Sequence, residues 1–186
     1  GDIEKETGKR VYTILQLRLH PAIIALRDQV LAAPKDKIFD VDLRYITSRG
    51  KWYHHSWKGE ESKSGGIATN IGIHFFDMLL WIFGSLTSLK IEKYESDHAS
   101  GFLELKRARV NWFLSINESH LPESVRAQGK RTYRSLRMDG AEVEFSEGFT
   151  DLHTTSYLEI LKGHGFGLQE ARPSIELAHQ IRKSGR

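Results

Sequence analysis

The stretch from Ser64 to Gly84 constrains the fold of this chain more than any other part of the sequence. Its apolar residues are frequent enough for a helix that is buried almost all round; they are Ile71, Phe75, Met78, Leu79, Ile82 and Phe83. Gly65 and Gly66 precede this run and permit the close approach of backbone or ligand, and Gly84 ends it. The pattern predicts a core helix.

Polar side chains interrupt this helix at a regular spacing. Asn70, His74, Asp77 and Trp81 follow one another at i, i+4, i+7 and i+11, so we expect them on one face. Histidine has an unperturbed pKa of about 6.5, which suits proton transfer at neutral pH. The amide, imidazole and carboxylate in register predict a functional face. The alternative is a core histidine that is hydrogen-bonded to a neighbour.

Strand-like segments surround this helix in the sequence. They cover residues 38–47, 86–94, 100–106, 110–117, 132–138 and 142–145, and Asp139 and Gly140 mark a hairpin turn between the last two. Helices are predicted over residues 21–33, over residues 152–161 with Asp151 as N-cap, and from Pro173 onward. The order predicts an α+β fold: an open, mainly antiparallel sheet with helices packed on one face. Trp112 and Leu114 suit a subunit interface on the other face, unless the domain buries them itself.

The first twenty residues differ in character from the rest. Residues 2–7 form a predicted helix with Gly8 as its stop, and the apolar run 11–17 suits a strand that is covered on both faces, as in a parallel sheet. A strand followed by G-x-G-x-x-G, which seats a dinucleotide on a helix N-terminus, is not found in the sequence. We therefore expect residues 1–20 to be the last helix and strand of a Rossmann domain, and residues 21–186 to be a substrate-binding and oligomerisation domain.

Several separated motifs carry a family resemblance. The pattern G-G-x-x-x-N-x-G-x-H-x-x-D over residues 65–77 resembles the substrate-domain signature of the glucose-fructose oxidoreductase, inositol dehydrogenase and MocA family of NAD(P)-dependent dehydrogenases. Many members have aspartate in place of Asn70. Residues 51–59, 112–115, 152–157 and 171–177 are similar to one branch of it, the WlbA and WbpB type enzymes. That branch oxidises the 3-hydroxyl of UDP-N-acetylglucosaminuronic acid in lipopolysaccharide O-antigen synthesis.

The resemblance implies catalytic roles for His74 and Asn70. It implies that Asp77 orients these residues without contacting the substrate itself. It also implies a nucleotide-sugar substrate, NAD or NADP as cofactor of the full-length protein, and a homodimer or homotetramer formed through the sheet face. The Glu-Lys-Pro motif of the family is absent, since Glu4 and Lys5 are followed by Glu6. No cofactor is expected on this chain alone, which we expect to be inactive by itself.

Other candidate substrate ligands lie outside the helix. Tyr53 and Lys58 belong to an aromatic loop that could hold a sugar ring and an acidic group, or could be pinned to the core by its two tryptophans. Gln16, Arg18 and His20 alternate at the end of the predicted first strand. Arg18 could pair with a uronic carboxylate or a phosphate, or could bridge two domains.

Two further sites concern an anion and a metal ion. Arg172, just ahead of the predicted start of the last helix, is a phosphate candidate. His54 and His55 are adjacent and point apart, so no metal site is predicted.

Composition excludes several classes of function. The 186 residues contain no cysteine, and a net charge of +3 with mostly alternating signs favours a solvated sheet edge over nucleic-acid binding. The apolar run 78–83 is too short to cross a bilayer, so we expect no membrane association and a cytoplasmic location. Two alternatives remain open at this point: a non-catalytic sugar-binding or oligomerisation module, and a related dehydrogenase that acts on another sugar.

Overall fold

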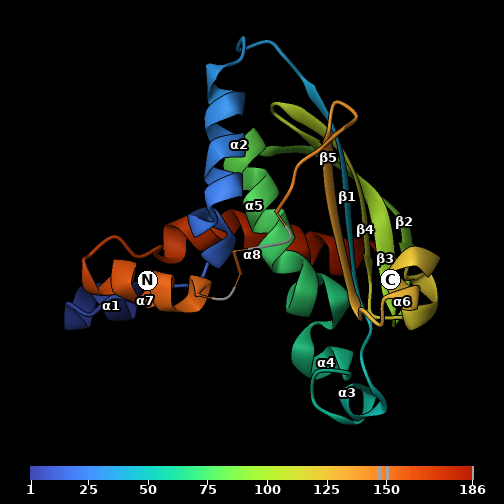
Figure 1. Cartoon of the computed structure of the whole chain (residues 1–186). Coiled ribbons are helices and arrows are strands. Elements are labelled where there is room, and N and C mark those ends of the chain that lie inside the picture. Colours follow the sequence, from blue (N-terminus) through green and yellow to red (C-terminus); the bar gives the residue numbers. More distant parts are fainter. Residues whose placement is uncertain (146–147, 150, 186) are drawn as a thin grey trace.

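The computed structural model describes residues 1–145, 148–149 and 151–185. It contains a six-stranded sheet with helices packed on one side of it (Figure 1). The strands are β1 (Phe39–Thr47), β2 (Leu86–Tyr94), β3 (His98–Leu105), β4 (Ala108–Ser115), β5 (Thr132–Met138) and β6 (Ala141–Glu142). The α+β fold predicted from the sequence is confirmed.

The sheet is mixed but mainly antiparallel. Its strand order is β2-β3-β4-β1-β5-β6, and only the pairing of β1 with β4 is parallel among the described strands. Phe39, Val41 and Leu43 of β1 are buried, as their alternation predicts. Asp139 and Gly140 both have positive φ, at 51° and 81°, so the predicted tight turn joins β5 to β6.

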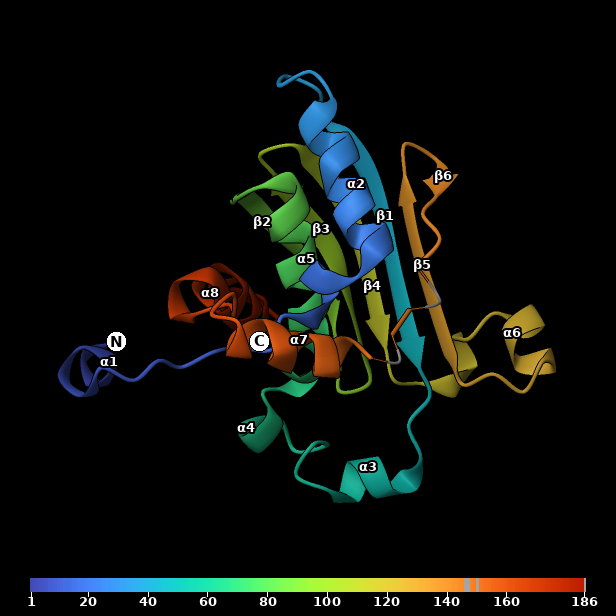
Figure 2. The same ribbon diagram turned by 60° about the vertical axis from the view of Figure 1, so that its left-hand side comes forward.

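Helices and short helical turns account for the remaining elements. They are α1 (Asp2–Thr7), the 3-10 helix η1 (Gln16–Leu19), α2 (Pro21–Ala32), α3 (Lys51–His55), α4 (Glu61–Ser64), the π-helical segment η2 (Ala68–Gly72), α5 (Ile73–Phe83), η3 (Glu118–His120), α6 (Glu123–Ala127), α7 (Leu152–Leu161) and α8 (Leu168–Ser184). Helices α2, α5 and α8 lie on the same side of the sheet, as both views show (Figure 1, Figure 2).

The core lies between α5 and the inner face of the sheet. Trp112 of β4 is fully buried there, with its ring edge-on to Phe76 of α5 at 5.3 Å between centroids. Leu114 is equally buried and lies close to Gly72, where an added Cβ would come within 2.8 Å of it. The domain therefore buries both residues itself, and neither can contribute to the subunit interface suggested for them.

The predicted first strand is wrong at its end, where residues 16 and 17 belong to η1. Helix α1 ends as predicted at Gly8, which is left-handed at φ 66°. Within the described residues, however, the following segment makes one isolated bridge, in which Thr13 pairs with Phe166, and residues 16–19 turn into η1. A strand requires a paired neighbour along its length, and hydrophobicity alone does not supply one.

The predicted start of the last helix is also wrong. Helix α8 begins at Leu168, and the Glu170 carboxylate accepts a 3.1 Å hydrogen bond from the backbone N–H of Gly167. Pro173 lies inside this helix. Arg172 is therefore not at the helix N-terminus. It lacks the free backbone N–H groups of a first helical turn that the sequence interpretation expected beside it to help bind a phosphate.

The apolar run 78–83 belongs to a longer helical stretch. Residues Glu61–Phe83 form a 23-residue stretch that is long and apolar enough, by length and composition, to cross a membrane. This corrects the expectation that the apolar segment around residues 78–83 is too short to cross a bilayer. Most of the stretch is buried against the sheet and α8, as in the core helix of a globular domain.

The basic runs have structural roles. The Arg107 guanidinium donates hydrogen bonds to the carbonyls of Val30, Ala33 and Pro34, and so satisfies the C-terminal end of α2. Arg134 lies over the ring of Phe149 at 4.2 Å. One arginine of each basic run thus has a structural partner within the domain.

Candidate functional site

The helix that carries the candidate residues is irregular at its start. Gly65 and Gly66 both have positive φ, at 77° and 69°, and separate α4 from the following helix. Asn70 lies in the π-helical segment η2, and His74 lies in the first turn of α5. Short π-helical segments occur often at functional sites, because the extra residue in the turn changes the direction of a side chain.

Tyr53 and Asn70 form a direct contact. The Asn70 amide donates a hydrogen bond to the Tyr53 hydroxyl at 2.7 Å, and Tyr53 is only 3% exposed. Trp52 and Trp57, in contrast, are 60% and 57% exposed. The buried tyrosine thus anchors the aromatic loop to the core, and the two exposed tryptophans do not.

His74 is partly buried, and its surroundings change its basicity. Burial lowers the pKa of His74 below its usual value, since the charged imidazolium loses water. The Asp77 carboxylate opposes this by favouring the charged form, while His153 on α7 adds to the lowering. A histidine in this state is neutral at pH 7 and can accept a proton.

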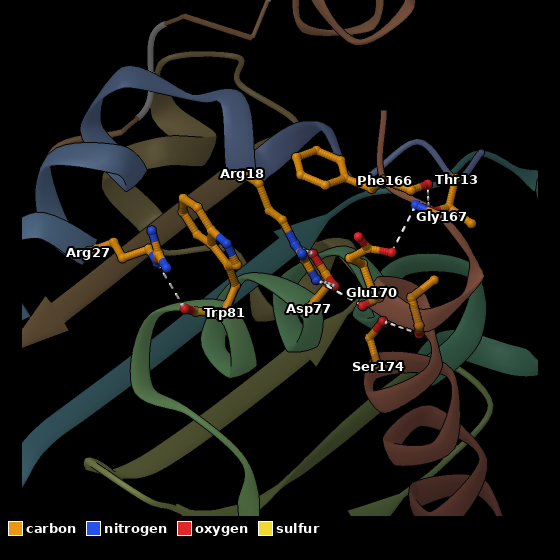
Figure 3. Close-up of polar contacts among 10 residues, drawn as sticks. Thr13, Arg18, Arg27, Asp77, Trp81, Phe166, Gly167, Glu170 and Ser174 are labelled. Atoms are coloured by element: carbon orange, nitrogen blue, oxygen red, sulfur yellow. Dashed lines mark hydrogen bonds and ion pairs between the residues drawn. The ribbon is translucent and has the colours of Figure 1, made fainter. Parts of the chain in front are cut away.

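Arg18 and Asp77 form a buried ion pair (Figure 3). Arg18 Nε lies 2.8 Å from Asp77 Oδ2, and Nη2 lies 2.7 Å from Oδ1. The two side chains are 9% and 2% exposed. Both carboxylate oxygens thus bind Arg18, and the guanidinium joins two segments of this chain, whereas the alternative interpretation expected it to bridge two domains.

Trp81 lies on the same side of α5 as Asp77, as the helical spacing predicts. Its ring centroid is 6.0 Å from the Arg18 guanidinium and 4.4 Å from that of Arg27, and its carbonyl accepts a hydrogen bond from Arg27 (Figure 3). Asp77 and Trp81, the C-terminal part of the predicted polar face, therefore contact Arg18 and Arg27, which precede this helix in the sequence.

Gln16 and His20 do not form a stripe with Arg18, because η1 replaces the expected strand. His20 is buried, and its Nδ1 accepts a hydrogen bond from the N–H of Ala22, so its side chain caps α2. The side-chain oxygen of Gln16 is buried and has no hydrogen-bond partner among the described residues. Gln16 therefore has a buried acceptor that no described residue satisfies.

Lys58 and Arg172 line different hollows. Lys58 borders a pocket of about 260 Å³ together with Tyr53, Glu61 and Tyr94. Arg172 borders an open cleft between α1 and the start of α8. The structure thus groups Lys58 with Tyr53, the hydrogen-bond partner of Asn70, and it does not bring Arg172 to them.

Sequence reasoning missed two contributors to the surroundings of His74 and Asp77. His153 acts on His74 from α7, and the Glu170 carbonyl accepts a 3.0 Å hydrogen bond from Arg18. His153 belongs to the motif 152–157 that carries part of the family resemblance, but neither contact has a local sequence signal, since both partners come from the C-terminal part of the chain. In the part of the chain that the structure describes, no group of three or more His, Asp or Glu side chains is arranged to hold a metal ion.

Comparison with known proteins agrees with this architecture. Residues 36–130 match the family model described as the oxidoreductase family, C-terminal alpha/beta domain, which carries the names Gfo, Idh and MocA. The WlbA (WbpB) dehydrogenase from Thermus thermophilus, solved with NAD and alpha-ketoglutarate, is 54% identical with a TM-score of 0.92. The same enzyme solved with NAD and UDP-GlcNAcA is 53% identical with a TM-score of 0.91.

A more distant structure shares the fold. The WlbA dehydrogenase from Bordetella pertussis, solved with NADH and UDP-GlcNAcA, is 17% identical with a TM-score of 0.72, and the match covers 98% of this chain and 63% of that one. The matches to the Thermus thermophilus enzyme cover 97% of this chain and 58% of that one, so this chain spans less than two thirds of the length of these relatives. By its fold and the matched model, the chain belongs to the glucose-fructose oxidoreductase, inositol dehydrogenase and MocA family of oxidoreductases, as a C-terminal α/β domain.

Proposed function

We propose that this chain is the substrate-binding part of an NAD(P)-dependent dehydrogenase that oxidises the 3-hydroxyl of UDP-N-acetylglucosaminuronic acid, a step of lipopolysaccharide O-antigen synthesis. The observation that carries the proposal is the 53% identity to a dehydrogenase solved with NAD and UDP-GlcNAcA, together with His74 and Asn70 on adjoining helical segments. Residues 1–20 then lead in from the nucleotide-binding domain, and the reaction takes place in the cytoplasm.

The described residues do not fit the pyrophosphate of the cofactor. Their glycine-rich stretch, residues 163–167, connects α7 to α8 and not a strand to a helix. In such a dehydrogenase, NAD held by the nucleotide-binding domain would supply the hydride acceptor. The steps that fall to this chain are therefore to bind the sugar and to take up the hydroxyl proton.

His74 is the proton acceptor in this proposal. Its partial burial and lowered pKa keep it neutral at pH 7, so a ring nitrogen is free of the proton it must take. Asn70, held by Tyr53 at 2.7 Å, offers its amide oxygen to a sugar hydroxyl or to the nicotinamide. Lys58, on the pocket wall beside Tyr53, supplies a cation for the acidic groups of the substrate, and the Gln16 oxygen offers an acceptor.

The open side of the sheet is the proposed subunit interface. Asp42 and Asn111 are hydrogen-bonded there at 2.8 Å, and Phe102 is 41% exposed beside them in the same shallow hollow. A homodimer or homotetramer formed through this face leaves the helix side free for the substrate and the nucleotide-binding domain.

The test is NAD reduction by the dehydrogenase that contains this chain, with UDP-N-acetylglucosaminuronic acid as substrate. We expect His74→Ala to lower kcat by about 10²- to 10⁴-fold, the usual contribution of a general base, and to leave NAD affinity nearly unchanged. His179→Ala, which changes an exposed histidine on α8, is the matched control and should keep full turnover.

Unchanged turnover in His74→Ala contradicts the assignment of the base. A protein that binds the nucleotide sugar but never reduces NAD contradicts the dehydrogenase and supports a non-catalytic sugar-binding module. Faster reduction with another UDP-sugar keeps the reaction and corrects the substrate.

A further inference from the structure

The buried ion pair of Arg18 and Asp77 has no direct part in the proposed reaction. Its two parallel hydrogen bonds, 2.8 and 2.7 Å long, fix both the distance and the plane of the carboxylate. With 9% and 2% exposure, neither side chain offers a free polar edge to a substrate. The pair therefore acts, if it acts in catalysis, on other residues of the protein.

The guanidinium is held on several sides (Figure 3). Its Nη2 also donates to the Glu170 carbonyl at 3.0 Å, and the ring centroids of Phe166 and Trp81 lie 5.1 and 6.0 Å away. Arg18 thus joins η1 to α5 and to the start of α8. Because a planar guanidinium between rings and a fixed carboxylate has little freedom to rotate, the position of the Asp77 carboxylate is determined by Arg18.

Asp77 follows His74 by one helical turn on α5, so the two side chains are neighbours on the helix surface. Among the described residues, the titratable groups that act on the pKa of His74 are the Asp77 carboxylate on its own helix and His153 on α7. Helix η1, which carries Arg18, packs against both α5 and α7. The segment around Arg18 therefore supports both groups that act on His74.

We propose that Arg18 is a positioning residue of the dehydrogenase: it holds the Asp77 carboxylate one turn from His74 and so sets the orientation and charge that this histidine experiences. The inference rests on the proposed function, because it assigns Arg18 a role toward the proposed base. It also replaces the substrate-binding role that the sequence suggested for Arg18 with a role inside the protein.

The first variant is the double substitution Arg18→Met with Asp77→Leu. Apolar residues of similar volume in place of a buried ion pair are usually tolerated in folding, whereas a single substitution leaves one charge buried and unpaired. We expect this variant to fold, with a circular dichroism spectrum like that of the parent. An exposed pair, Asp2→Leu with Lys5→Met, is the matched control.

The first readout is the NMR titration of the His74 ring in the folded protein. Because the variant lacks the carboxylate that favours the charged imidazole, the midpoint of His74 should move to lower pH, while the control keeps the parental midpoint. An unchanged midpoint overturns the inference. This readout needs no turnover, so it separates failure of the inference from failure of the dehydrogenase proposal, which shows as a parent protein that never reduces NAD.

The second readout is the division of the effect between kcat and KM. A misplaced base should lower kcat by about 10- to 100-fold, and KM for the nucleotide sugar should change by less than about 3-fold. Arg18→Lys, which keeps the charge but not the two-pronged contact, should lose less of kcat. A raised KM with unchanged kcat, seen with UDP-N-acetylglucosaminuronic acid but not with UDP-N-acetylglucosamine, which lacks the uronic carboxylate, overturns the inference and makes Arg18 a carboxylate ligand.

Discussion

The Tyr53 hydroxyl accepts a 2.7 Å hydrogen bond from the Asn70 amide, and this contact joins the aromatic loop to the helix of the candidate site. Asparagine can present either its oxygen or its NH₂ group to a ligand. Because the NH₂ group is engaged by Tyr53, the carbonyl oxygen is the end that is left for a substrate. The loop therefore determines which half of the amide is engaged within the protein.

Tyr53→Phe should weaken the site without unfolding the protein. The change removes one oxygen atom and allows the Asn70 amide to rotate, so we expect kcat/KM for the nucleotide sugar to fall by about 5- to 10-fold, the value of one hydrogen bond. Steady-state kinetics measure this. Tyr157→Phe, at an exposed tyrosine of α7, is the control, and an equal loss in both variants would show that the effect is not local.

The stability of the protein should depend on His74 in mild acid. Burial lowers the pKa of His74 in the folded state, whereas an unfolded histidine has a pKa of about 6.5. Below about pH 6.5 the unfolded chain thus binds more protons than the folded one, so the free energy of unfolding falls as the pH decreases toward the folded-state pKa. Above about pH 6.5 this contribution is fully present.

Urea unfolding at about pH 7.5 and about pH 5 measures this effect. The parent should lose more stability between the two pH values than His74→Gln, which cannot be protonated. Other acid-sensitive groups, such as Asp97, are common to both proteins and cancel in the comparison. Equal losses would mean that the imidazole gains its proton equally easily in both states.

Gly72→Ala should destabilise the fold. A Cβ atom at this position would lie 2.6 Å from Phe76 Cε2 and 2.8 Å from Leu114 Cδ1, closer than carbon atoms can approach. Overpacking of this kind costs about 1–3 kcal/mol of the free energy of unfolding. Thermal or urea unfolding tests the value. Gly50→Ala, where the nearest atom is 3.2 Å away on an exposed tryptophan, should change stability much less.

Arg107→Met should destabilise the C-terminal end of α2. Its guanidinium serves the carbonyls of Val30, Ala33 and Pro34, and hydrogen bonds from a charged donor are worth about 1.5–3 kcal/mol. We expect a loss of about 2 kcal/mol, measured by urea unfolding. Arg109→Met, at the exposed neighbour two residues on, should have little effect.

The sheet was accessible to sequence reasoning because its signals are local. Alternation in Phe39, Val41 and Leu43 requires only that one face be buried, and Asp139 with Gly140 encodes a turn in two residues. Residues 86–94 and 132–138 were predicted with the bounds that β2 and β5 have. Errors arose where the outcome depends on distant partners, since the run that begins at Val11 has too little to pair with beyond Phe166.

The candidate site was predictable in part for the same reason. The spacing of Asp77 and Trp81 predicts their common face, but it does not reveal the π-helical segment around Asn70, because a π turn has no composition of its own. The partner of Asp77 could not be read locally either. Arg18 lies far away in the sequence, and an arginine that binds a substrate carboxylate has the same sequence signal as one that binds a carboxylate of its own protein.

The central position of β1 in the sheet has a consequence for biosynthesis. Its hydrogen-bonding neighbours β4 and β5 are both translated long after it, following the whole of α5 and the β2–β3 hairpin. During translation β1 lacks its hydrogen-bonding neighbours until β4 and β5 have been made. Strand pairing over such sequence distances is slow. The nascent chain therefore exposes an unpaired, aggregation-prone strand until β5 has been synthesised. If expression depends on chaperones, we expect them to act between the synthesis of β1 and that of β5.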